Sequence, residues 1–87
     1  ENTGDEHNQT AEFEVPAGSP FAGKRLVELK LPESALVLLI RRGNNFVVPR
    51  GATQVQERDA LMLIASEKDL DEIAKRILPE HAAQEEV

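Results

Sequence analysis

The chain of 87 residues contains no cysteine, no tryptophan and no tyrosine, and phenylalanine is its only aromatic residue. Without cysteine it can form neither a disulfide nor a thiolate metal site. Its longest unbroken apolar run is 35–40 (ALVLLI), far below the roughly 18 residues that a membrane-spanning helix needs. The length allows one small domain with a single core. The sequence therefore predicts one soluble domain.

The chain begins with Glu1 and not with methionine. No succession of basic, apolar and small residues typical of a secretory signal follows it. We therefore expect a piece of a longer protein.

Negative charge is concentrated at the two ends of the chain. Residues 1–14 and 80–87 together hold eight acids and no lysine or arginine. The other eight acids and all ten bases lie within residues 15–79, which therefore carry a net charge of +2. The sequence thus predicts a slightly basic domain between acidic ends.

Both ends are expected to lie outside the folded domain. The first ten residues (ENTGDEHNQT) contain no large apolar side chain whose burial could offset the entropy lost on ordering. We therefore predict a disordered linker over 1–11, a domain over 12–79 and an acidic tail over 80–87.

The first part of the domain carries signals for a strand and a short helix. Polar and apolar residues alternate over 12–15, as in a half-buried strand. Ser19 followed by Pro20 is typical of a helix N-terminus, so a short helix is predicted near 20–30.

The middle of the domain predicts a β-hairpin. Residues 35–40 are apolar at every position, so as a strand they must be covered on both faces. Gly43 and Asn44 are suited to the turn, and 46–48 (FVV) to the returning strand.

The last part of the domain predicts a strand and an amphipathic helix. Residues 60–65 (ALMLIA) form another continuous apolar run of strand length. Ser66 and Asp69 have the spacing of a capping box, and apolar residues follow at intervals of three and four up to Pro79. The result is an α+β fold: a small single sheet with a central β-hairpin, one short helix and one C-terminal amphipathic helix.

Two strands that are apolar on both faces exceed what two helices, one of them short, can cover. Self-association is the economical way to bury the remaining surface, and a twofold dimer is its commonest form. We therefore expect a homodimer.

The sequence shows no pattern of catalytic or metal-ligating residues. Its two histidines, His7 and His81, both lie in the predicted tails, where no rigid partner could hold them. It has no glycine-rich phosphate loop, no histidine pair at helical spacing and no calcium-loop pattern. We expect no enzyme, no catalytic residue and no metal site.

Three arginines near the hairpin, Arg41, Arg42 and Arg50, lie in a stretch of ten residues without an acid. Guanidinium groups fork hydrogen bonds onto phosphate or carboxylate, and a neighbouring apolar wall would pack a flat base, which favours an anion pocket. The same arginines could instead solvate the hairpin end and protect a sheet edge from pairing. Nucleic acid is the weaker candidate, since stacking tyrosine and tryptophan are absent and the acidic ends would repel phosphates.

Taken together, these segments resemble a known family, the TrkA-C domain, also called the C-terminal domain of RCK regulators of potassium transport. The resemblance covers about 12–78 and rests on FEVP at 13–16, SPFAGK at 19–24, ALVLLIRRGNNFVVPRG at 35–51 and ALMLIA at 60–65, in this order. The form with VP and SPFAGK is most similar to the domain attached to bacterial monovalent cation/proton antiporters, especially potassium/proton antiporters.

The resemblance implies a dimeric cytoplasmic regulatory domain that follows a membrane transport domain in the same parent chain of an inner-membrane transport protein. Some family members bind a nucleotide, cyclic di-AMP in several potassium transporters, between two subunits; no other cofactor is implied. The matching pocket positions here are Leu36, Ile40, Arg41, Asn45 and Pro49, with Arg42 in place of Arg41 if the register slips by one residue. The alternative is a structural dimerisation module without a ligand.

One position departs from the family pattern. The family usually has a Gly-Asp turn before its last strand, whereas here Arg58 precedes Asp59. Arginine tolerates a positive φ poorly, so the sequence leaves the geometry of this turn open.

Overall fold

The computed structural model describes residues 8–79, which form a four-stranded antiparallel sheet with an α-helix packed on it. Along the chain the elements are β1 (Asn8–Glu14), the 3₁₀ helix η1 (Leu26–Leu29), β2 (Leu36–Arg42), β3 (Asn45–Val47), β4 (Ala60–Ser66) and α1 (Glu67–Arg76). The strand order in the sheet is β1-β4-β2-β3. The predicted α+β class, the hairpin and the C-terminal helix are confirmed.

Several sequence predictions fall outside the described residues, namely His7, His81, most of the linker and the acidic tail over 80–87. Within residues 8–79 no helix combines the length and the apolar character needed to cross a bilayer.

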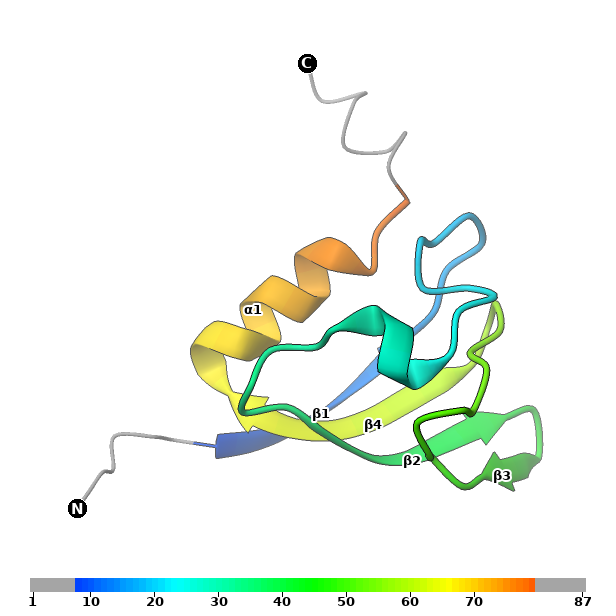
Figure 1. Ribbon diagram of the computed structural model, residues 1–87, viewed down its shortest axis with the longest axis horizontal. Helices are drawn as coiled ribbons and strands as arrows, with labels where there is room; N and C mark the ends of the chain where they lie inside the picture. Colours follow the sequence, from blue (N-terminus) through cyan, green and yellow to red (C-terminus); the bar gives the residue numbers. More distant parts are fainter. Residues whose placement is uncertain (1–7, 80–87) are drawn as a thin grey trace.

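The two faces of the sheet differ. Figure 1 shows α1 and η1 on the same side of the sheet. The face beneath them carries the core, which is formed by buried residues from the sheet, η1, α1 and the loops: Val15, Phe21, Leu29, Ile40, Val55, Leu61, Leu63, Ala65, Ile73 and Ile77. Most of these side chains are fully enclosed, so the core depends on one face of the sheet only.

A bulge in β2 decides which of its side chains face this core. Val37 and Leu39 both pair with residues of β4, but Leu38 between them has no partner there. An extra residue reverses the alternation for every side chain that follows it. Ile40 therefore faces the core, and Arg41 faces the opposite side of the sheet.

β1 begins at Asn8, earlier than the strand predicted over 12–15, so the predicted linker over 1–11 extends too far. Residues 8–10 are exposed but continue the ladder with β4, where Asn8 lies opposite Ser66. Strand pairing uses backbone groups, which need no apolar side chain. A criterion based on apolar side chains therefore missed the start of the strand.

The short helix predicted near 20–30 is present only as one turn of 3₁₀ helix over Leu26–Leu29. The chain instead makes turns up to Gly23, whose φ is +87°, and then the single 3₁₀ segment η1. Gly23 donates its N–H to the Val55 carbonyl (2.7 Å), and Leu26 donates to the Thr53 carbonyl (2.9 Å). Because these N–H groups bind carbonyls far along the chain, they cannot form the backbone hydrogen bonds of an α-helix over 20–30.

The predicted start and end of α1 are confirmed. The Ser66 hydroxyl caps the helix by accepting a hydrogen bond from the Asp69 N–H (3.2 Å), and the helix ends before Pro79. Near its C-terminus, Arg76 donates to the carbonyls of Leu29 and Lys30, which attaches the helix to η1.

The turn before β4 keeps a positive φ although it lacks glycine. Arg58 has a φ of +73°, and its N–H donates to the Val15 carbonyl (2.7 Å). The left-handed conformation costs an L-residue about 1–2 kcal/mol, so this position carries local strain. The neighbouring hydrogen bonds impose the conformation on arginine.

We predict that Arg58→Gly stabilises the domain by about 0.5–1 kcal/mol, because relief of the strain exceeds the extra entropy that glycine gains in the unfolded chain. Arg58→Ala is the control, since alanine removes the same side chain but keeps the strain. Urea unfolding followed by circular dichroism measures both. Equal stability of the glycine and alanine variants would contradict the prediction.

Candidate functional site

The face of the sheet opposite α1 is apolar and exposed. Leu36 is 59% exposed and Phe46 is 65% exposed, although both lie within strands. We call this surface the outer face and define it by Glu12, Glu14, Leu36, Leu39, Arg41, Phe46, Met62 and Ile64, which the strand registers place there, together with the exposed Leu38 at the bulge. A contiguous exposed apolar surface of this kind marks an interaction site.

Arg41 is the one basic residue of the outer face. It lies opposite Ala60 of β4 on one side and opposite Phe46 of β3 on the other. Its guanidinium forms an ion pair with the Glu12 carboxylate of β1. The side chains of Arg41 and Glu12 are 47% and 46% exposed, so both charges remain in contact with solvent.

Arg42 lies on the core side of the sheet. Its Nε and Nη2 atoms donate to the two carboxylate oxygens of Asp59 at 2.9 and 2.8 Å, and Nη2 also donates to the Gln54 carbonyl at 3.0 Å. Asp59 is 1% exposed and accepts a further hydrogen bond from the Gln56 N–H at 2.9 Å. Through Nε and Nη2, Arg42 thereby joins β2 to the connection before β4.

This ion pair keeps both partners charged. Burial by itself would raise the pKa of Asp59, but the hydrogen bonds from Arg42 and from the Gln56 backbone lower it below its ordinary value. The hydrogen bond to Asp59 raises the pKa of Arg42. The carboxylate and the guanidinium therefore stabilise each other's ionised form.

The structure separates the residues that the sequence analysis grouped as a pocket. Leu36 and Arg41 lie on the outer face as a pocket would require. Ile40 is 0% exposed because the bulge turns it into the core, so its assignment to a pocket wall is wrong. The alternative of Arg42 in place of Arg41 in the pocket is corrected as well, since the buried Asp59 occupies the Arg42 guanidinium.

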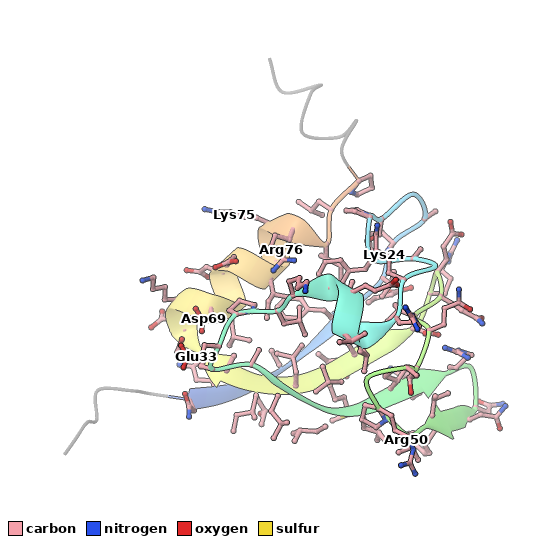
Figure 2. All side chains as sticks on the ribbon, viewed as in Figure 1. Lys24, Glu33, Arg50, Asp69, Lys75 and Arg76 are labelled. Carbon is pink, nitrogen blue, oxygen red and sulfur yellow. The ribbon has the colours of Figure 1, made fainter. Side chains whose placement is uncertain are left out.

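Two further predicted residues lie near the hairpin end. Asn45 is exposed and stands opposite Arg42, on the other side of the sheet from Arg41. Pro49 is half-buried in the loop after β3. Figure 2 shows Arg50 in the same loop, with its side chain extending away from the sheet. The three arginines of the hairpin region thus do not converge on one pocket.

Sequence reasoning missed several residues of the outer face. The sequence predicts strands that contain Leu38, Phe46 and Met62 but not their outward face, because runs that are apolar throughout do not reveal which side chains point outward. In the sequence Glu12 belongs to the acidic N-terminal segment, and only the register of β1 brings it near Arg41. The alternation of acids with apolar residues in 12–15 was the one signal that Glu12 faces solvent.

A polar cluster at the start of α1 has a structural role. The Ser34 hydroxyl donates to Asp69 Oδ2 at 2.6 Å and lowers the pKa of Asp69. The Ser66 N–H donates to the Ser34 hydroxyl at 3.0 Å. Figure 2 shows Asp69 at this end of the helix, close to the loop that carries Glu33. The cluster fastens the loop before β2 to the helix cap.

Other parts of the described surface offer little chemistry. A hollow of about 330 Å³ is lined by Glu14, Pro16, Ala17 and Arg58, and it contains none of the predicted ligand residues. Residues 8–79 contain no group of three or more acidic or histidine side chains arranged to hold a metal ion.

Comparison with known proteins relates the sequence to one family. A sequence model of the TrkA-C domain matches residues 10–78. The Trk system potassium uptake protein TrkA of Mycobacterium tuberculosis is 29% identical over 68 residues, which are 78% of this chain and 31% of that protein. A TrkA homolog of Archaeoglobus fulgidus is 37% identical over 59 residues, which are 68% of this chain and 14% of that protein. The chain thus spans a third or less of the length of these relatives.

Solved structures show the same fold at lower sequence identity. A structure described as an RCK domain with cda has a TM-score of 0.69 at 21% identity, over 77% of this chain and 94% of its own. The RCK_C domain dimer of S. agalactiae BusR in complex with c-di-AMP has a TM-score of 0.69 at 20% identity, over 78% and 93%. A GsuK channel bound to NAD has a TM-score of 0.65 at 19% identity, over 80% and 13%.

The two neighbouring arginines should respond differently to replacement by alanine. Arg42→Ala leaves Asp59 buried without its partner and should cost about 3–5 kcal/mol, whereas the half-exposed pair of Arg41 is worth about 1 kcal/mol or less. Urea unfolding at one fixed protein concentration measures both losses. Similar losses in the two variants would show that the arginines do not differ in this way.

Proposed function

Because the chain belongs to the TrkA-C domain family, we propose that it is the regulatory ligand-binding domain of a potassium/proton antiporter or another potassium transport protein. In this proposal it acts on the cytoplasmic side of the inner membrane, with a membrane transport domain in the same parent chain. Two copies form a dimer and bind a nucleotide such as cyclic di-AMP between them. The observation that carries the proposal is the exposed apolar outer face with Arg41 within it.

A second copy of this chain is the occupant proposed for the outer face. Strands that expose leucine, methionine and phenylalanine to water lose favourable burial, which an identical apolar face can restore. The RCK_C domain of S. agalactiae BusR, which shares this fold, is described as a dimer, and this supports dimer formation here.

We predict that the chain sediments at equilibrium with twice its 9.6 kDa mass at micromolar concentration, and that Leu38→Lys shifts it to the monomer. The change places a charge in the proposed interface, where its desolvation is costly. Leu78→Lys is the matched control: Leu78 is 52% exposed, against 46% for Leu38, but it follows α1 and lies outside the outer face. A monomeric unmodified chain, or a dimer that survives Leu38→Lys, would contradict this interface.

Arg41 is the proposed anion receptor of the dimer. A guanidinium donates charge-assisted hydrogen bonds to a phosphate, each worth about 1.5–3 kcal/mol net. Phe46, which stands opposite Arg41 in β3, and Leu39, two positions before it in β2, offer an apolar surface on which a flat base can pack, and Leu36 lies further along the same face. Pro49, in the loop after β3, is proposed as a further contact, whereas Asn45 lies on the other side of the sheet from Arg41 and is left out of the proposed site. A ligand on the twofold axis would meet Arg41 from both subunits.

Arg41→Ala should weaken nucleotide binding about a hundredfold, which corresponds to roughly 3 kcal/mol for a lost pair of hydrogen bonds. Calorimetric titration with cyclic di-AMP, AMP and ATP measures the loss. Arg50→Ala is the control, because it removes the same charge from an exposed loop residue. Binding that survives Arg41→Ala unchanged would remove the assignment of Arg41.

The alternative function is a structural dimerisation module without a ligand. The extensive outer face supports this alternative as well as the sensor, since dimerisation alone would cover it. A dimer whose melting temperature is unchanged by every nucleotide would favour the alternative.

A further inference from the structure

Arg41 already has an anionic partner within its own chain. Its guanidinium is paired with the carboxylate of Glu12, which belongs to the edge strand β1. The two residues lie on strands that are not neighbours, because β4 runs between β1 and β2. The Arg41 side chain must therefore cross the central strand to reach Glu12.

The strand registers show how this crossing is made. Arg41 stands opposite Ala60 of β4, and Glu12 stands opposite Met62, so the pair is diagonal across that strand. Two strand spacings amount to about 9.5 Å, a distance that two long side chains can bridge when the residue between them is small. Ala60 is 5% exposed although its side chain is on the outer side of the sheet, as expected beneath a long side chain.

A phosphate and the Glu12 carboxylate require the same donors. The guanidinium that would fork onto a phosphate is the group that Glu12 holds, and both acceptors are anions. A phosphate ligand must displace the carboxylate, or else bind beside a like charge. In either case the free energy of the internal pair opposes binding, whereas a neutral ligand that does not use Arg41 escapes this opposition.

We propose that Glu12 is an internal competitor for Arg41, which lowers the affinity of the outer face for phosphate-bearing ligands and sets the concentration at which they bind. This inference rests on the proposed function, because it takes Arg41 to be the anion receptor. Glu12 acts through Arg41 and is a residue that tunes specificity.

The size of the effect follows from the exposure of the pair. Half-exposed ion pairs contribute modestly, so release of Arg41 should raise the affinity for a phosphate ligand about two- to fivefold. The affinity for adenosine, which carries no phosphate, should not change. The effect should shrink as salt is added, because salt screens exposed charges.

The test compares Glu12→Gln with Glu14→Gln in calorimetric titrations with cyclic di-AMP and with adenosine. Glu14 is the matched control: it lies on the same side of β1 and stands across β4 from Arg41, with Ala60 between them, yet it is not in an ion pair with any described residue. Both variants remove one negative charge at a similar place. Only Glu12→Gln removes the contact with Arg41.

A double variant, Glu12→Gln with Glu14→Gln, prevents Glu14 from replacing the lost partner. We expect tighter binding of cyclic di-AMP by Glu12→Gln and by the double variant, and little change in Glu14→Gln. Binding by Glu12→Gln where the unmodified chain binds nothing would also support the inference.

Three results would overturn the inference. An equal gain in affinity for cyclic di-AMP in the two single variants would mean that the negative charge of β1 as a whole, and not the contact with Arg41, lowers the affinity. If the unmodified chain binds through Arg41 and the affinity is unchanged in Glu12→Gln and in the double variant, the competing role of Glu12 is contradicted. The proposed function then remains in place. Absence of binding in every form, with the dimer intact, would remove the proposed ligand function and this inference together.

Discussion

The ion pair between Arg42 and the buried Asp59 is the interaction on which the rest of the structure depends. It joins the end of β2 to the connection before β4, and through the Gln54 carbonyl and the Gln56 N–H it also fixes that connection. The backbone of Asp59 extends the link to β1, because its carbonyl accepts the Val15 N–H at 2.8 Å. The side-chain pair and this backbone hydrogen bond together hold three strands at one corner. The strained φ of Arg58 is tolerated at this corner because the surrounding bonds leave the turn no alternative.

The same pair separates the two arginines that are adjacent in the sequence. With Arg42 directed inward to Asp59, the pleat directs Arg41 outward. The bulge at Leu38 shifts the alternation so that Ile40, and not Arg41, faces the core. One side of the sheet is consequently a closed core under α1. The other side is an apolar surface whose one basic residue, Arg41, forms a half-exposed ion pair with Glu12 of the edge strand β1.

This division assigns different physical roles to similar side chains. A forked bond to a buried carboxylate is costly to break, because the carboxylate would remain buried with neither a partner nor water to solvate it. A half-exposed pair can exchange its partner at small cost, since water and salt compete for it at all times. Within the outer face the pair of Arg41 is of the second kind, which suits the role proposed for it in binding a ligand. The relation to Trk potassium uptake proteins gives the proposed ligand response its context in ion transport.

Residues close together in the chain suffice to predict the order of the elements, the hairpin turn at Gly43 and Asn44, the cap of α1 at Ser66 and the resemblance to the TrkA-C family. Tertiary contacts settle which apolar residues face outward, since a run such as 35–40 has no polar residue to mark a face and the bulge appears only in its pairing with β4. They also limit the helix within 20–30 to the 3₁₀ segment η1, because Gly23 and Leu26 donate their backbone N–H groups to residues far along the chain. The contact between Glu12 and Arg41 likewise depends on the tertiary structure. It joins two non-adjacent strands, and their order in the sheet is set by the packing of the whole domain.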